Sequence, residues 1–179
     1  MKRRLILRIL SGVFLIVALS GIPNFLYAQK PPGDFGFGLI LGDPLGGTVK
    51  YWVSANNALV ADIGESYFGV PRIDLDYLWH FNSFNSRIVL LYGGIGGAVG
   101  FGYDYNYYGV FYNRGDGRPF YYRYGATSSV GIGVRAIFGL TIVPKRTPLE
   151  FFIEAGPLLG IVPNFGVGFD LAVGVRFYP

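Results

Sequence analysis

The chain has 179 residues, a length that fits one domain, and it contains no cysteine, which excludes a disulfide framework. Charged residues make up only 15% of it, against about 25% in a typical soluble domain, whereas aromatic residues make up 18% and glycine contributes 28 residues. This composition indicates that water is not the main solvent of the protein.

The first 28 residues have the features of a cleavable signal peptide, which leaves residues 29–179 as the mature domain. Lys2, Arg3 and Arg4 form a basic start, residues 9–19 are mostly apolar, and Ala28 precedes the expected cleavage site. The apolar run is shorter than the roughly 20 residues that span a bilayer, so a retained anchor helix is the weaker alternative. Removing the segment lowers the Lys and Arg count from 15 to 11, which equals the 11 Asp and Glu. The mature chain is then formally neutral, and charge gives no argument for nucleic-acid binding.

From Gly33 onward the sequence predicts β-strands, because no window of helical period is free of interrupting Gly or Pro. The first three predicted strands cover residues 35–41, 48–53 and 59–65. In each strand every second side chain is apolar, and these side chains are Phe35, Phe37, Leu39 and Leu41, then Val49, Tyr51 and Val53, then Leu59, Ala61 and Ile63.

The fourth predicted strand, residues 72–81, alternates most clearly between two kinds of side chain. One face carries large apolar groups, and the other carries charged groups and the only histidine. The apolar face consists of Ile73, Leu75, Tyr77, Trp79 and Phe81, and the polar face includes Arg72, Asp74, Asp76 and His80. One face of the sheet is therefore expected to meet hydrocarbon and the other to meet polar partners.

Four further strands are predicted at residues 87–103, 124–140, 149–155 and 166–178. The face opposite the apolar residues is made of Gly and Ala with a few charges, rather than the Lys, Glu, Thr and Gln expected next to bulk water. Small residues with balanced charges suit a crowded lumen. The sequence thus predicts an all-β fold, a closed eight-stranded antiparallel transmembrane β-barrel, with a soluble secreted barrel as the rival.

Two further patterns fit a membrane barrel. The apolar faces end in aromatic residues, as in the girdles at bilayer interfaces, and these are Tyr51, Tyr77, Trp79, Tyr103, Tyr124 and Phe177. With the N-terminus in the periplasm, the longest connection, residues 104–123, points outward, and the turns at 54–57, 82–86 and 141–148 point inward and are short.

The sequence resembles the small eight-stranded outer-membrane barrels of the OmpA/OmpX type over nearly the whole mature chain. More narrowly, Gly38 to Pro44 (Gly-Leu-Ile-Leu-Gly-Asp-Pro), Lys50-Tyr51-Trp52 with Asn57-Ala58, and Phe152 to Pro157 (Phe-Ile-Glu-Ala-Gly-Pro) are similar to an uncharacterised bacterial barrel family known from spirochaetes and other bacteria. The sequence differs from such barrels in its last residues, because they usually finish on an aromatic residue and here Pro179 follows Tyr178. The resemblance implies a bacterial outer-membrane location and lipid contact, but no activity.

Eight strands enclose a space that side chains roughly fill, so we expect a plugged lumen held by ion pairs. If the turn after the sixth strand is symmetric about 144 and 145, Arg135 lies opposite Glu154, and Asp76 and Asp62 can reach the same level. A seventh-to-eighth connection centred on Pro163 similarly sets Glu150 opposite Arg176. Glycines on the inner face leave a narrow channel for water or small solutes as an alternative.

The outward connection is rich in tyrosine and is a candidate binding surface. Tyrosine offers a large contact area at low entropic cost, so the loop at 104–123 is expected to contact a host or envelope protein. The residues predicted to bind are Tyr105, Tyr107, Tyr108, Arg114, Asp116 and Tyr121. Arg114-Gly115-Asp116 is also the tripeptide that integrins recognise, although three residues are a weak signal.

Catalysis is not expected. His80 is the only histidine, which excludes a two-histidine metal site, and no helix follows the glycine-rich strands to hold a phosphate. A membrane-embedded lipid-modifying enzyme would need a serine and an acid beside the histidine at the outer rim, whereas His80 is predicted at the periplasmic end. We therefore expect a monomeric barrel without cofactor, with a structural or adhesin-like surface role.

Overall fold

The computed structural model describes residues 31, 33–84, 86, 88–102, 110–112, 119–121, 129–145, 147–162 and 165–179. The signal-peptide prediction for residues 1–28 lies outside these ranges. The described residues form ten strands: β1 (Phe35–Gly42), β2 (Leu45–Trp52), β3 (Asn57–Ser66), β4 (Gly69–Phe81), β5 (Val89–Gly102), β6 (Val110–Tyr112), β7 (Pro119–Tyr121), β8 (Ser129–Ile142), β9 (Leu149–Val162) and β10 (Gly166–Phe177). Among them, no helix is long and apolar enough to cross a membrane.

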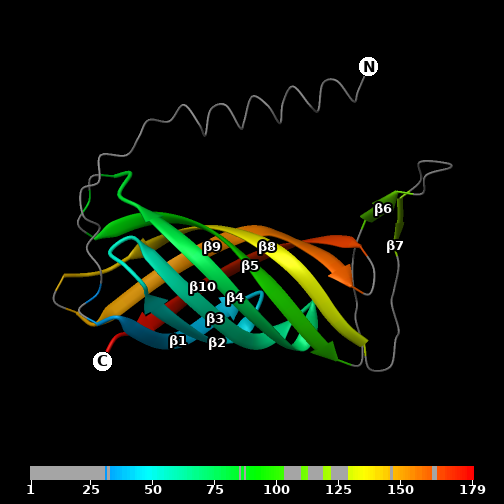
Figure 1. Ribbon diagram of the computed structural model, residues 1–179, viewed down its shortest axis with the longest axis horizontal. Helices are drawn as coiled ribbons and strands as arrows, with labels where there is room; N and C mark the ends of the chain where they lie inside the picture. Colours follow the sequence, from blue (N-terminus) through cyan, green and yellow to red (C-terminus); the bar gives the residue numbers. More distant parts are fainter. Residues whose placement is uncertain are drawn as a thin grey trace, which may run out of the picture.

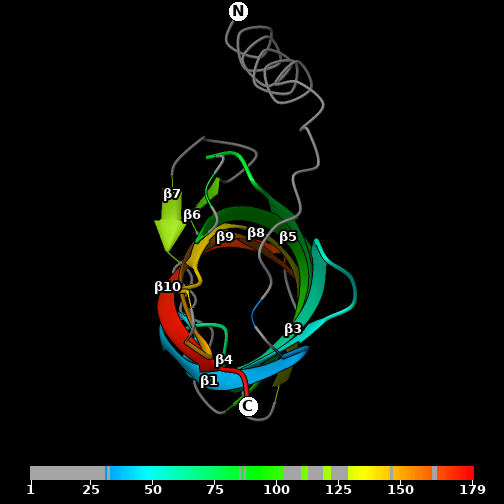
Figure 2. The same ribbon diagram turned by 90° about the vertical axis from the view of Figure 1, so that its left-hand side faces the viewer.

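Eight of the strands close into an antiparallel barrel, as the sequence predicts. Their order around the barrel is β1-β10-β9-β8-β5-β4-β3-β2, and β6 and β7 pair separately as a hairpin. Figure 1 shows the barrel from the side and Figure 2 shows it from one end. The β6–β7 hairpin lies at one end of the barrel, here called the hairpin end, and the C-terminus lies at the other, here called the terminal end (Figure 1).

The strands turn their apolar face outward and their charged face into the lumen. Leu39, Leu75 and Phe138 are 61%, 60% and 67% exposed, whereas Lys50 and Arg72 are fully buried. A lipocalin-type barrel has the reverse arrangement, with the apolar face inside. The period-two pattern of the sequence therefore corresponds to an inside-out barrel.

The observed strands differ from the predicted ones mainly at their ends. β9 continues to Val162, seven residues beyond the predicted end at residue 155. Pro157 lies within this extension opposite Phe169 of β10, although proline lacks the N–H that a central strand normally uses. A prediction that treats proline as a strand breaker therefore ends this strand before Pro157, which is too early. The first part of the predicted strand 124–140 also lies outside the described residues.

The predicted register between β8 and β9 is wrong by four residues. Glu154 lies opposite Gly139, and Arg135 lies opposite Leu158. The turn is centred between residues 146 and 147 and not between 144 and 145, because Ile142 pairs with Phe151. Since the error is an even number, every side chain keeps its face. The predicted register between β9 and β10, with Arg176 opposite Glu150, is confirmed.

Several lumen-facing positions hold glycine because a large side chain lies over each of them. A Cβ added at these positions would come within 3 Å of an aromatic ring atom, so only glycine leaves enough room. The pairs are Gly36 with Tyr178, Gly139 with Tyr92, Gly168 with Tyr67, and Gly174 with Phe152. Among the described residues, buried apolar side chains form four small clusters and not one continuous core.

Candidate functional site

Charged side chains gather in the lumen, and each is at most 4% exposed. They are the four cations Lys50, Arg72, Arg135 and Arg176, and the six carboxylates Asp62, Asp74, Asp76, Glu150, Glu154 and Asp170. Six carboxylates against four cations leave a formal charge of −2 among these described residues. Burial makes an unpaired charge costly, so the pairing of each group decides what the lumen can do.

Arg72 is the centre of one network, here called the Arg72 network. Its Nε donates to Asp74 at 2.8 Å, its Nη2 donates to Asp170 at 2.6 Å, and its Nη1 lies 3.2 Å from Asp43. A guanidinium offers five N–H donors in a fixed plane, which suits one cation that serves several carboxylates. The side chains of β4 and β10 and the β1–β2 turn are held together by this one residue.

Arg135 continues the Arg72 network toward the middle of the lumen. It donates to the second oxygen of Asp74, its Nη2 lies 3.2 Å from Glu154, and its Nε lies 3.7 Å from both Asp76 and Asp170. Tyr92 donates its hydroxyl to Glu154 at 2.8 Å. Arg135 and Glu154 meet although they are four residues out of register, because the long arginine side chain extends along the lumen.

The β3–β4 turn, residues 67 and 68, covers the Arg72 network at the hairpin end. Tyr67 donates its hydroxyl to Asp170 at 2.7 Å, and Phe68 is buried against Ala98 and Leu158. Ser66 donates its hydroxyl to Asp43, and burial is the largest of the effects that raise the pKa of the Asp43 carboxyl. Burial likewise raises the pKa of the Tyr67 phenol. These side chains lie against Arg72 and Asp170 at the hairpin end.

A second network, here called the Lys50 network, lies toward the terminal end. Lys50 Nζ donates to Glu150 at 2.7 Å and lies 2.9 Å from His80 Nε2. Thr141 donates to the same Glu150 oxygen at 2.8 Å, and Tyr178 donates its hydroxyl to the other oxygen. All these groups are buried, so Glu150 of β9 joins Lys50 of β2, Thr141 of β8 and Tyr178 after β10.

Aromatic rings and Arg176 complete the Lys50 network. Lys50 Nζ lies 4.3 Å from the centroid of Trp52, whose Nε1 donates to Tyr178 at 3.3 Å. Arg176 stacks 3.8 Å from the ring of Phe152 and donates from Nε and Nη2 to Thr48 at 3.0 and 2.8 Å. Its Nη1 lies 3.5 Å from Glu150. Ring faces attract buried cations, which adds to the ion pairs.

The structure brings the predicted lumen residues together, although Asp62 lies opposite Thr48 and Asp74 and not opposite a cation. Glu150 lies near Arg176, and Arg135 near Glu154 and Asp76, at the distances given above. Neither carboxylate oxygen of Asp62 makes a hydrogen bond of good geometry. Sequence reasoning places Arg72 and Asp74 on the inner face but does not identify Arg72 as a centre, since β4 and β10 are not adjacent in the barrel.

His80 has the contacts of a structural histidine. Its Nδ1 lies 3.3 Å from the carbonyl oxygen of Asn56, and its Nε2 contacts Lys50. Its ring lies between Trp52 and Tyr92. Within the described part of the chain, no group of three or more His, Cys, Asp or Glu side chains is placed to hold a metal ion.

The predicted surface loop is described only in part. Tyr105, Tyr107, Tyr108, Arg114 and Asp116 lie outside the described residues. Tyr121 belongs to β7, which pairs with β6 so that Val110 faces Tyr121 and Tyr112 faces Pro119. The described part of the loop therefore contains a short antiparallel hairpin, and no statement follows about its side chains.

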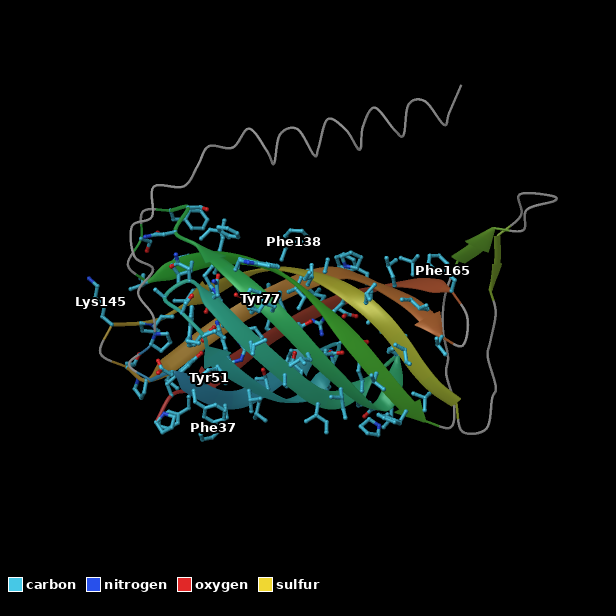
Figure 3. All side chains as sticks on the ribbon, viewed as in Figure 1. Phe37, Tyr51, Tyr77, Phe138, Lys145 and Phe165 are labelled. Atoms are coloured by element: carbon cyan, nitrogen blue, oxygen red, sulfur yellow. The ribbon has the colours of Figure 1, made fainter. Side chains whose placement is uncertain are left out.

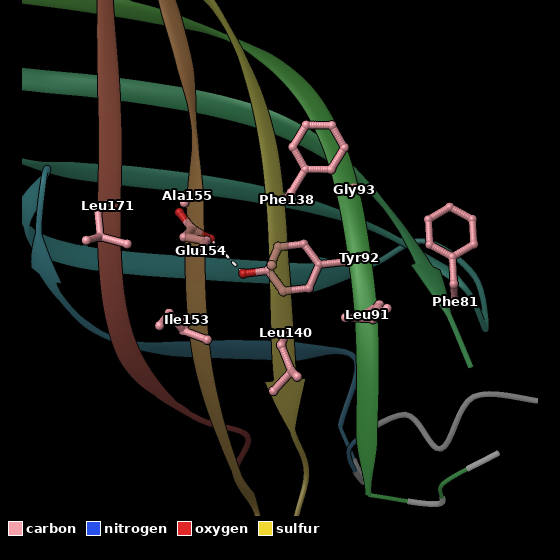
Figure 4. Close-up of a pocket in the computed structure, with 11 residues that line it drawn as sticks. Phe81, Leu91, Tyr92, Gly93, Phe138, Leu140, Ile153, Glu154, Ala155 and Leu171 are labelled. Carbon is pink, nitrogen blue, oxygen red and sulfur yellow. Dashed lines mark hydrogen bonds between the residues drawn. The ribbon is translucent and has the colours of Figure 1, made fainter. Parts of the chain in front are cut away.

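An open groove of about 510 Å³ lies on the outer surface across β5, β8 and β9. Phe81, Leu91, Phe138, Leu140, Ile153 and Leu171 line it, and the hydrogen bond from Tyr92 to Glu154 lies behind it (Figure 4). Its surface is almost entirely apolar, so it offers no polar group to orient a ligand. The polar chemistry of the molecule is in the lumen.

Comparison with known proteins shows the fold. No protein-family model matches the sequence, and no match was found among curated proteins. Among solved structures, the N-terminal β-barrel domain of Pseudomonas aeruginosa OprF matches with a TM-score of 0.56 and 14% sequence identity, over 83% of this chain and 98% of that chain. The narrower resemblance to an uncharacterised bacterial family stays a prediction. The chain shares the closed eight-stranded barrel architecture of the OprF domain.

Proposed function

We propose that this protein is an integral barrel of the bacterial outer membrane, with a closed lumen and a structural or surface-interaction role, and without catalytic activity. The observation that carries the proposal is the reversed polarity of the barrel. Large apolar side chains cover its outside, and charged side chains fill its inside. In water such an outer surface would aggregate, whereas in a bilayer it faces hydrocarbon.

The dimensions and the closure of the barrel support the same proposal. β4, β5, β8 and β9 have 13 or 14 residues, enough for tilted strands to cross an apolar band roughly 25 Å tall. Closure leaves no unpaired edge, which a bilayer requires. Phe37 and Tyr51 lie near the terminal end and Phe165 near the hairpin end, with Tyr77 and Phe138 between them, while Lys145 lies beyond the strands (Figure 3).

The protein is expected to stay with the membrane when envelopes are washed with high salt and to leave only in detergent. The reason is that hydrophobic contact, and not surface charge, holds an inside-out barrel in the bilayer. Fractionation followed by electrophoresis with and without heating measures this, since a folded barrel migrates differently from the boiled chain. Release by salt alone would exclude the membrane proposal.

The surface role rests on the segment beyond the hairpin end. The β6–β7 hairpin lies outside the barrel strands (Figure 1), and the sequence around it is rich in tyrosine. A projecting aromatic loop on a rigid barrel is suited to contact an envelope or host protein. The partner class proposed here is therefore a protein surface, with outer-membrane lipid around the barrel.

Deleting residues 106–121 is expected to leave membrane insertion intact and to abolish binding to the partner. The segment contains β6 and β7, which pair only with each other, so the barrel hydrogen bonds are kept. Heat-modifiable migration measures insertion, and cell-surface binding measures the loop. Loss of the folded form after the deletion would mean that the loop belongs to the barrel core.

A further inference from the structure

The lumen contains two polar networks. Asp43, Ser66, Tyr67, Arg72, Asp74, Asp76, Tyr92, Arg135, Glu154 and Asp170 belong to the Arg72 network. Thr48, Lys50, Trp52, His80, Thr141, Glu150, Arg176 and Tyr178 belong to the Lys50 network. Among the hydrogen bonds and ion pairs that these described residues make, none joins one network to the other. The ring of Tyr92 approaches His80 and Lys50, so the networks meet there through an aromatic face only.

Six buried side-chain polar atoms of the described lumen residues lack a hydrogen bond, although Arg135 Nε lies 3.7 Å from Asp76 and Arg176 Nη1 lies 3.5 Å from Glu150. Three of these atoms belong to the Arg72 network: both carboxylate oxygens of Asp76 and the Nε of Arg135. One atom, the Nη1 of Arg176, belongs to the Lys50 network. The remaining two are the carboxylate oxygens of Asp62. Asp62 lies in register with Thr48 of the Lys50 network on one side and with Asp74 of the Arg72 network on the other, which places it between them.

The kinds of atom identify what can satisfy them. Carboxylate oxygens alone would favour a cation, but here two guanidinium N–H groups accompany them, and these repel a cation. Water both donates and accepts, and buried water typically joins polar groups that have no other partner. Leaving such groups unsatisfied is costly in a barrel surrounded by hydrocarbon, which favours an occupant that donates to the carboxylates and accepts from the guanidinium groups.

We propose that the lumen is closed twice in series, by the Arg72 network and by the Lys50 network, and that water is bound between them at Asp62, Asp76, Arg135 and Arg176. This inference rests on the proposed closed membrane barrel and deepens it. It refines the expectation of a plugged lumen held by ion pairs. Each network blocks one end of a hydrated chamber, so breaking either one opens the chamber to one side without opening a pore.

A single introduced thiol tests the two closures, because the chain has no cysteine of its own. Asp62→Cys places this thiol in the chamber without removing a member of either network. The Lys50 network is broken by Lys50→Ala with Glu150→Ala, and the Arg72 network by Arg72→Ala with Asp170→Ala. Each double substitution removes one positive and one negative charge, so the net charge is unchanged and neither member of the ion pair stays behind alone. Lys145→Cys, at an exposed position in the β8–β9 turn, is the matched control.

The reaction of a small charged thiol reagent with the purified, folded barrel is the first measurement. With both networks intact, the thiol at position 62 is expected to be protected while the thiol at position 145 reacts freely. Breaking either network is expected to raise the reaction rate at position 62 roughly tenfold or more, because protection then depends on one closure only. Rapid reaction with both networks intact, or unchanged protection after breaking either one, would overturn the proposal.

Conductance across a planar bilayer is the second measurement. The wild-type barrel and each doubly substituted barrel are expected to be closed, and only the barrel with all four substitutions is expected to conduct. Conductance after breaking one network would mean that a single closure seals the lumen. If the quadruple variant does not fold, the thiol reaction rates of the two double variants decide. Failure of the wild-type chain to float with lipid vesicles would instead contradict the membrane function.

The bound water has its own test. Cross-relaxation between water and the backbone amides of Asp62 and Asp76 is expected in nuclear magnetic resonance spectra of the wild-type barrel. It is expected to disappear when Asp62→Leu and Asp76→Leu fill the chamber with apolar groups, while the amide of Lys145 keeps its signal in both proteins. A wild-type barrel without this cross-relaxation would show a dry lumen and refute the chamber.

Discussion

Arg135→Ala is expected to lower the free energy of unfolding by about 3 to 5 kcal/mol, the usual cost of removing one partner from a buried ion pair. Arg135 lies within 4 Å of Asp74, Asp76, Glu154 and Asp170. After its removal, Asp74 and Asp170 keep Arg72, and Glu154 keeps Tyr92. Asp76 loses the one cation that pairs with it among the described residues. Urea unfolding in lipid vesicles measures the change, with the exposed Lys145→Ala as control.

A charge swap between Arg135 and Glu154 tests whether Arg135 pairs with Glu154 alone or with several carboxylates at once. If the two residues were directly opposed, as the sequence predicts, Arg135→Glu with Glu154→Arg would recover part of the lost stability. The structure predicts no recovery, because a carboxylate at position 135 would lie among Asp74, Asp76 and Asp170. An unfolding midpoint near the wild-type value for Arg135→Ala itself would mean that bulk water solvates the lumen.

The fold is predictable because the side-chain period of a strand is strict. Alternation assigns each residue to a face without knowledge of its neighbours, and in this way it assigns Arg72, Asp76, Arg135, Glu150 and Arg176 to the inner face. An even error in register leaves this assignment unchanged, which is why the misplaced turn after β8 does not alter the predicted fold.

The pairing of the charges is less predictable, because it depends on contacts across the lumen. Arg72 and Asp170 come from β4 and β10, which are not adjacent in the barrel, and no turn geometry relates them. Arg135 meets Glu154 only through the length of its side chain. The role of Tyr67 and Phe68 is also not predictable from the sequence. The alternation of apolar and polar residues does not indicate that a two-residue turn folds back into the lumen.

Gly156→Ala is expected to cost about 3 kcal/mol or more, because the added methyl group would overlap backbone and not a movable side chain. Gly156 faces the lumen from β9, and a Cβ there would collide with the carbonyl oxygen of Ala136. Strands β8 and β9 would have to separate locally, between the pairs Phe138 with Ala155 and Arg135 with Leu158. Flexible side chains can rotate away from a new methyl group, but a paired backbone cannot.

Gly97→Ala is the matched control, because it adds the same methyl group on the outer face of β5. The nearest atom to a Cβ at this position is the carbonyl oxygen of Gly133 at 3.7 Å, which is ordinary contact. Its effect is expected to stay within about 0.5 kcal/mol, or to be slightly stabilising, since alanine loses less backbone entropy than glycine. Urea midpoints of the two variants, measured in the same vesicles, test the difference. Equal midpoints would show that other small residues can replace the inward-facing glycines. A large difference between the midpoints would show that the close approach of two strands requires glycine at position 156.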